Sequence, residues 1–351
     1  MFYEDTIAAI ATSSKDGSIS IIRISGPEAV NIVSNSFVGK SGKKIDLTQK
    51  QSHTIHFGYI KDSNGEVIDE VIVLLMMAPK SYTMENMCEI NSHGGIIIQK
   101  LILEVCLKNG AILAEPGEFT KRAFLNGRID LSQAESVIEL INSKTDKEAK
   151  ASIEQLEGRI SKNINIIRKD LLNILSDIEA TIDYPEYDIE EVTNNRAMQE
   201  LKNVLEKLNK LEESFKTGKI LKEGIKTIII GKPNAGKSSL LNLILNADRA
   251  IVSDIAGTTR DTIEEYINIK GIPLKLIDTA GIRETNDIIE EIGVNKSINL
   301  INEADLIISI FDNSKELDEE DYKILKMIEN KNAIIVLNKI DLGDVQLQKQ
   351  D

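Results

Sequence analysis

The segment from residue 225 to residue 239 constrains the fold more than any other part of this chain. A run of β-branched residues at 227–230 predicts a buried strand, and Gly231-Lys232-Pro233-Asn234-Ala235-Gly236-Lys237-Ser238 follows it directly. Apolar residues at helical spacing then begin at Leu240. A strand, a glycine turn and a helix start together point backbone N–H groups at one phosphate. An ordinary glycine turn capping a helix is a weak alternative, because it does not explain the preceding strand.

This motif predicts a nucleotide site with defined roles for its polar residues. We expect Lys237 to reach the β- and γ-phosphates and the Ser238 hydroxyl to hold Mg²⁺. Downstream, Asp278-Thr279-Ala280-Gly281 ends a strand, where Asp278 would hold Mg²⁺ through water and the Gly281 N–H would sense the γ-phosphate. In the loop at 257–261, Thr259 is the expected switch threonine.

The base is predicted to be guanine. Asn338-Lys339-Ile340-Asp341 follows a buried strand, and the Asp341 carboxylate can accept from both N1–H and the 2-amino group of guanine, which adenine does not offer. GTP is therefore favoured over ATP. The full set of expected GTP-binding residues is Asn234, Ala235, Gly236, Lys237, Ser238, Ser239, Ser253, Asp254, Ile255, Ala256, Gly257, Thr258, Thr259, Asp278, Thr279, Ala280, Gly281, Asn338, Lys339 and Asp341.

Composition sets the broad class of protein. At 351 residues the chain should hold two or three domains. It lacks an apolar run approaching ~20 residues and a basic-then-apolar leader, so neither membrane spanning nor secretion is expected. Cys88 and Cys106 are too few for a disulfide framework, which predicts a cytoplasmic location. A net charge of −14 argues against broad, non-specific binding to nucleic acid.

Three domains are predicted from the changing pattern along the chain. Residues 1–120 are mixed α/β, with strands at 6–11, 19–24, 55–60, 67–76 and 111–114 and helices at 28–37 and 95–107. Residues 121–222 carry long amphipathic helices with a break at 182–185, which indicates a helical domain. A coiled-coil rod is a weaker alternative, because the apolar positions hold no strict heptad.

Residues 223–351 alternate strands with helices, at 227–230, 266–269, 274–277, 306–311 and 333–337. The strands at 266–269 and 274–277 are expected to form a hairpin around 271–273, and the others to be linked by parallel crossovers. This pattern predicts a Ras-like α/β domain of the P-loop class.

Taken together, these motifs make the chain similar to a known family, the bacterial tRNA-modification GTPases called MnmE or TrmE. The resemblance covers essentially the whole length and rests on the segments at 7–12, 23–26, 116–127, 131–135 and 231–239. The stretch Gly117-Glu118-Phe119 with Arg122-Ala123-Phe124-Leu125-Asn126 is far more specific than the GTPase motifs. Era-like ribosome-assembly GTPases share only the latter and leave residues 1–220 unexplained.

The resemblance implies a fold, partners and a folate site. Members dimerise through an N-terminal domain similar to folate-binding domains, and bind 5-formyl-tetrahydrofolate (or methylene-tetrahydrofolate) there. As a heterotetramer with the flavoprotein MnmG, they install an aminomethyl-type or carboxymethylaminomethyl-type group at C5 of the wobble uridine (U34) of certain tRNAs. Arg23, Glu89 and Arg128 match the folate-site residues, although Arg128 stands where lysine is usual and Met84 where glycine is usual. A glycine with φ > 0 there would leave Met84 strained.

The resemblance also implies how GTP is hydrolysed. The family uses K⁺ near the phosphates in place of an arginine finger, and Asn234, Ser253, Ile255 and Thr258 match its K⁺ site. Glu290 matches the acid that orients the attacking water, so Glu290, Thr259 and Lys237 are the expected catalytic residues, with Ser238 and Thr259 on Mg²⁺. From the residues alone, Asn234 could be a simple turn residue, and Glu290 cannot be preferred to Glu291.

The sequence stops ten residues after Asp341. A Ras-like domain needs another strand and helix, and the family has a C-terminal Cys-x-Gly-Lys motif that is absent here. The sequence therefore predicts a truncated member of the family. Two functions remain open: a K⁺-dependent GTPase of tRNA modification, or a dimeric folate-binding module without GTPase activity.

Overall fold

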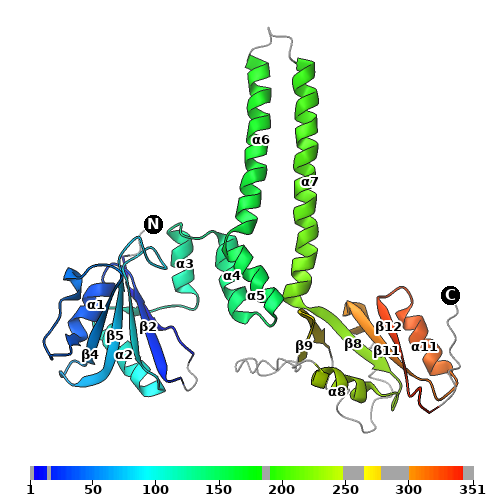
Figure 1. The fold of residues 1–351 in the computed structure, drawn as a ribbon, viewed down its shortest axis with the longest axis horizontal. Coiled ribbons are helices and arrows are strands. Elements are labelled where there is room, and N and C mark those ends of the chain that lie inside the picture. Colours follow the sequence, from blue (N-terminus) through cyan, green and yellow to red (C-terminus); the bar gives the residue numbers. More distant parts are fainter. Residues whose placement is uncertain (1–3, 14–16, 184–189, 248–264, 278–299, 343–351) are drawn as a thin grey trace. The chain divides into compact units, whose positions relative to one another are not determined.

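The computed structural model describes residues 4–13, 17–183, 190–247, 265–277 and 300–342 (Figure 1). The chain divides into two compact units, Met1–Val137 and Ile138–Asp351, which are described one at a time.

The first unit is built on a seven-stranded sheet in the order β3-β4-β5-β6-β2-β1-β7. Neighbouring strands are antiparallel except for β1 and β7, which are parallel. The strands are β1 (Ile7–Ile10), β2 (Ile19–Ser25), β3 (Phe37–Gly39), β4 (Thr54–Lys61), β5 (Val67–Met76), β6 (Met87–His93) and β7 (Ile112–Leu113). The expected strands are present within one or two residues, but the sequence analysis did not identify β3 or β6.

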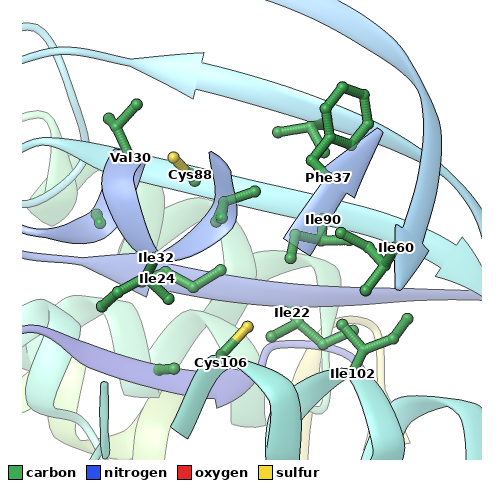
Figure 2. Close-up of a cluster of buried hydrophobic side chains, with 14 of the residues drawn as sticks. Ile22, Ile24, Val30, Ile32, Phe37, Ile60, Cys88, Ile90, Ile102 and Cys106 are labelled. Carbon is green, nitrogen blue, oxygen red and sulfur yellow. The ribbon is translucent and has the colours of Figure 1, made fainter. Parts of the chain in front are cut away.

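Two helices cover one face of this sheet. The helices α1 (Ala29–Ser36) and α2 (Ile96–Lys108) pack on Ile22, Ile24, Cys88 and Ile90 of β2 and β6, as Figure 2 shows. Both cysteines are buried free thiols, and burial raises the pKa of each to about 12. The helix predicted to reach residue 37 ends at Ser36, because Phe37 begins β3 and is fully buried. A short 3₁₀ turn, η1 (Leu47–Gln49), follows β3.

A buried arginine holds the last part of this unit in place. The helix α3 (Glu118–Leu125) carries Arg122, whose side chain is fully buried. Its guanidinium donates to Glu118 (2.8 Å), to Asp5 (2.9 Å) and to Glu85 (3.3 Å). A buried charge is stable only when paired in this way. The compact unit therefore continues past residue 120, where the change of pattern placed a boundary, and divides from the second unit after Val137, within α4 (Leu131–Asn142).

The second unit begins with helices. After α5 (Asp146–Leu156), the chain forms α6 (Arg159–Asp183) and α7 (Glu190–Glu223), which run antiparallel (Figure 1). Ile167 and Ile174 of α6 pack against Ala197 and Val204 of α7. The helix α6 ends within the predicted break. Among the residues that the structure describes, no helix is long and apolar enough to cross a membrane.

A five-stranded sheet in the order β12-β11-β8-β10-β9 follows these helices. Its elements are β8 (Ile225–Gly231), α8 (Lys237–Ala247), β9 (Glu265–Ile269), β10 (Ile272–Leu276), β11 (Leu306–Asp312), α11 (Glu319–Ile328) and β12 (Ala333–Asn338). Only β9 and β10 pair antiparallel, as predicted. Their turn lies at Lys270–Gly271, however, and Pro273 sits inside β10 rather than in the turn. The division into three domains stays a prediction.

The strand β8 is central because it is buried on both faces. Ile229 packs in one cluster with Leu241 of α8, and Ile228 packs in another with Ile328 of α11. This double burial explains why a continuous apolar run, rather than an alternating one, precedes the glycine turn. It also fixes the turn after β8 against a rigid strand.

The loop between β5 and β6 contains the expected backbone strain. Met84 has φ = 61°, in the left-handed region that favours glycine. Its neighbours on both sides are pinned, since Thr83 and Glu85 are buried and both bond the Ser25 hydroxyl at 2.6 and 2.7 Å. The neighbouring contacts therefore hold Met84 in a conformation that a side chain disfavours.

We predict that Met84→Gly stabilises the first unit relative to Met84→Ala by about 1 kcal/mol, because only the alanine variant keeps a Cβ at positive φ. Comparing these two variants removes the effect of losing the methionine side chain. Hydrogen exchange of the β2 and β6 amides measures the free energy of unfolding of this unit alone. Equal protection in both variants would show that the loop relaxes without cost.

Candidate functional site

The loop between β8 and α8 forms a phosphate-sized turn of backbone. Gly231, Asn234 and Gly236 all have positive φ, and the Ala235 N–H donates to the Lys232 carbonyl at 3.2 Å. Gly236 is required for a second reason, because a Cβ there would lie 1.9 Å from the side-chain nitrogen of Asn338. Asn234 is exposed at the tip of the turn with φ = 62°. The structure therefore confirms the strand, the glycine turn and the helix start that the sequence predicts.

Lys237 lies at the mouth of this turn. Its ammonium donates to the Gly231 carbonyl at 2.7 Å and to the Lys232 carbonyl at 2.8 Å. Burial lowers the pKa of Lys237, since removing the ammonium from water disfavours its charged form. A phosphate at the mouth of the turn would offset that cost. Ser238 lies in the same first turn of α8 and is half-buried, while Ser239 is exposed.

The loop after β12 is tied to the phosphate loop. The Asn338 side-chain amide donates to the Ala235 carbonyl at 2.8 Å. Lys339 follows with φ = 59°, and its ammonium donates to Asp312 at 2.7 Å. This bond, with a second from the Ser314 hydroxyl, holds the pKa of Asp312 well below its usual range. Asp341 is exposed in the turn closed by the bond from the Leu342 N–H to the Lys339 carbonyl.

The structure therefore brings together Asn234, Ala235, Gly236, Lys237, Asn338 and Lys339 at the carboxyl ends of β8 and β12. Sequence analysis missed three acidic residues beside them, Asp312, Asp318 and Asp321. Asp312 could have been found as the last residue of β11, the strand between β8 and β12 in the sheet. Asp318 and Asp321 carry a signal too, since an acidic residue three positions before another, ahead of an apolar run, indicates a helix cap.

Several expected site residues lie outside the described residues. They are Ser253, Asp254, Ile255, Ala256, Gly257, Thr258, Thr259, Asp278, Thr279, Ala280, Gly281 and Glu290. Within the part of the chain that the structure describes, no group of three or more His, Cys, Asp or Glu side chains could hold a metal ion. A P-loop magnesium ion does not need such a group, because a hydroxyl and phosphate oxygens are its usual ligands.

A second cluster in the first unit gathers the other predicted residues. Arg23 of β2 and Glu89 of β6 are direct cross-strand partners, and their side chains are 2.8 Å apart. They lie on the sheet face opposite to α1 and α2, because their neighbours Ile24 and Cys88 point into the core. The Arg23 guanidinium is 5.4 Å from the centre of the Tyr82 ring, and that of Arg128 is 4.5 Å from it. Tyr82 thus sits beside both arginines.

Sequence analysis missed Tyr82 and Phe119 in this cluster. The Phe119 ring lies 5.6 Å from the Arg23 guanidinium, and the Tyr82 hydroxyl bonds Thr120 at 2.9 Å. Two arginine guanidinium groups lie over half-buried aromatic rings and make a surface suited to a flat, anionic ligand. Glu89 adds an acceptor beside them.

Comparison with known proteins identifies the family of this chain. Residues 6–128 match the family described as GTP-binding protein TrmE N-terminus, and residues 131–345 match the MnmE helical domain. The tRNA modification GTPase MnmE of Acetivibrio thermocellus is 55% identical over 345 residues, which are 98% of this chain and 74% of that protein. The MnmE of Carboxydothermus hydrogenoformans is 52% identical over 97% of this chain and 73% of its own length, and that of Bacillus velezensis is 51% identical over 96% and 74%. With both family matches and this identity over nearly its whole length, the chain belongs to the MnmE (TrmE) family.

Proposed function

We propose that this chain is a GTPase of tRNA modification that acts at C5 of the wobble uridine. The observation that carries the proposal is the joined pair of loops, in which Asn338 bonds the phosphate loop at Ala235 while Lys237 lies at its mouth. The curated relatives at 51–55% identity are named as tRNA modification GTPases. A module that binds folate without GTP is less well supported, because it would leave this arrangement without a use.

Each described residue of the nucleotide site has a role in this proposal. The N–H groups from Asn234 to Ser239 would hold the phosphates, and Lys237 would stabilise the negative charge that builds on the γ-phosphoryl group. The Asp341 carboxylate would accept from guanine, and Asn338 and Lys339 would frame the base. Thr259 and Glu290, which lie outside the described residues, are proposed as the switch threonine and the residue that orients water.

Two metal ions fit the residues present. Ser238, in the first turn of α8, would hold Mg²⁺ together with Thr259, and the exposed side-chain oxygen of Asn234 would hold K⁺ together with Ser253, Ile255 and Thr258. These ions supply positive charge against the phosphates when bound. The exposure of Asn234 at the loop tip, where its φ is positive, is compatible with this role.

The arginine cluster is proposed as the folate site. Arg23, Arg128 and Glu89 would bind 5-formyl-tetrahydrofolate, or methylene-tetrahydrofolate, beside the Tyr82 ring. We further propose a homodimer formed through the first unit, a heterotetramer with the flavoprotein MnmG, and tRNA as substrate. The buried free thiols of Cys88 and Cys106 suit a cytoplasmic location.

The base assignment is tested with Asp341→Asn. We expect GTP affinity to fall roughly 10- to 100-fold, since losing a hydrogen bond to a charged group costs about 1.5–3 kcal/mol, and xanthosine triphosphate affinity to rise. A titration with fluorescent GTP and its xanthine analogue measures both. Asp146→Asn, on an exposed residue of α5, is the matched control. Unchanged GTP affinity in the Asp341 variant would refute the assignment.

The cation site is tested with Asn234→Gly, which removes the side-chain oxygen but keeps the positive φ without strain. We expect wild-type GTP hydrolysis to be faster in K⁺ than in Na⁺, and the variant to hydrolyse at the same rate in both. Its GTP affinity should stay within about threefold, because an exposed neutral side chain contributes little. Phosphate release in matched salts is the measurement. A wild type that does not distinguish the two ions removes the role of Asn234.

The folate site is tested with Arg128→Met and Arg128→Lys. We expect the methionine variant to bind 5-formyl-tetrahydrofolate about tenfold more weakly, because the positive charge over Tyr82 is lost. The lysine variant should stay within about threefold, since the charge survives. Titration calorimetry measures both, with Arg168→Met on the exposed side of α6 as control. Equal affinity in all variants would place the ligand elsewhere.

A further inference from the structure

The phosphate loop carries two charged side chains, Lys232 and Lys237. Lys237 faces the phosphates in the proposal above, whereas Lys232 has no role there. The Lys232 ammonium donates to Asp318 and to Asp321, each at 2.6 Å. The Lys232 side chain is 19% exposed and that of Asp321 is 6% exposed, so this ion pair is largely removed from water. The bond to Asp318, followed by that to Asp321, raises the pKa of Lys232. The ammonium therefore keeps its charge at neutral pH.

The two carboxylates are rigid acceptors because they cap α11. Asp318 accepts from the N–H groups of Glu320 and Asp321 at 3.0 and 3.2 Å, and Asp321 accepts in return from the Asp318 N–H at 3.1 Å. This reciprocal capping box fixes both side chains to the backbone of the helix start. Lys232 is thus bound to the start of the helix, where Asp321 is buried and Asp318, although its side chain is 59% exposed, is fixed by its capping bonds.

The backbone of the same residue touches Lys237. The Lys232 carbonyl accepts from the Lys237 ammonium at 2.8 Å, so the position of residue 232 determines where that ammonium lies. The chain from Asp312 to Asp321 also reaches the base loop, because Asp312 at its start holds Lys339 at 2.7 Å. One segment therefore holds a lysine of the phosphate loop at one end and a lysine of the base loop at the other.

We propose that Lys232 is a positioning residue for GTP, which anchors the phosphate loop to the start of α11 and so holds Lys237 in place for the triphosphate. The proposal rests on the GTP site described above. The positive charge of Lys232 also neutralises two nearby carboxylates. Without the ammonium, the Asp318 and Asp321 carboxylates would repel each other and add negative potential near a bound triphosphate. Loss of Lys232 should therefore speed nucleotide release more than loss of an ordinary surface lysine.

The test compares Lys232→Met, Lys232→Arg and Lys331→Met in the full chain, using the dissociation rate of a fluorescent guanosine nucleotide. The Lys331 ammonium donates to the neutral Asn302 side chain at 3.1 Å, and Lys331 serves as the matched control on the same unit. We expect roughly tenfold faster release from Lys232→Met. Release from Lys232→Arg should stay within about threefold of wild type, and Lys331→Met should match wild type. KM for GTP should rise in Lys232→Met, and the single-turnover hydrolysis rate of bound GTP should fall as well, because a displaced Lys237 stabilises the γ-phosphoryl charge less well.

A double variant separates positioning from general loss of stability. Asp321→Asn in the Lys232→Met background removes the carboxylate that has lost its partner. The release rate of this double variant should therefore differ clearly from the sum of the effects of Lys232→Met and Asp321→Asn measured separately. Wild-type release from Lys232→Met, or additive effects in the double variant, overturns the inference while leaving GTP binding intact. Loss of nucleotide from Lys232→Arg as fast as from Lys232→Met also overturns it. Absence of GTP binding by the wild-type chain overturns the proposed function itself.

Discussion

The nucleotide site depends on one hydrogen bond between two loops, from the Asn338 amide to the Ala235 carbonyl. The two loops follow β8 and β12, which flank β11 in the sheet, so their carboxyl ends emerge one strand apart. They can meet only because Gly236 has no side chain at the point of contact. The phosphate turn and the turn after β12 are therefore joined, and a nucleotide bound as proposed would be held at both ends against the same sheet.

Two arginines of the first unit have different roles, and the burial of their side chains distinguishes these roles. Arg122 is fully sealed among Asp5, Glu85 and Glu118, so it stabilises the fold and offers nothing to a ligand. Arg23 is 28% exposed beside Tyr82 and keeps part of its guanidinium open. Although the chain has a net charge of −14, the partly open guanidinium of Arg23 can still attract an anionic ligand locally.

Sequence alone predicted the elements whose signal is local. The glycine spacing after β8 and the apolar run of β8 itself depend on neighbouring residues, and the structure contains both. The positive φ at residue 84 was expected only from the resemblance, because the family usually has glycine there. The strand β6 was missed because Met87, Cys88 and Ile90 are its apolar residues, and the polar run Asn91, Ser92 and His93 that follows leaves too short an alternating pattern. This omission hid the pairing of Arg23 with Glu89. That contact is set by strand register, and the contacts of Lys232 with Asp318 and Asp321 are likewise set by folding across 86 or more residues.

Met84 and Arg128, the two residues that the resemblance marks as departures from the family pattern, are connected through one loop. Tyr82, two residues before Met84, carries the Arg128 guanidinium 4.5 Å above its ring centre. The Asn126 amide donates to the Thr83 carbonyl at 2.7 Å, so the end of α3 that leads to Arg128 is tied to the same loop. A planar guanidinium can stack flat on a ring in a way that an ammonium cannot. The loop that contains Met84 and the guanidinium of Arg128 therefore meet at Tyr82, whose ring lies beside Arg23.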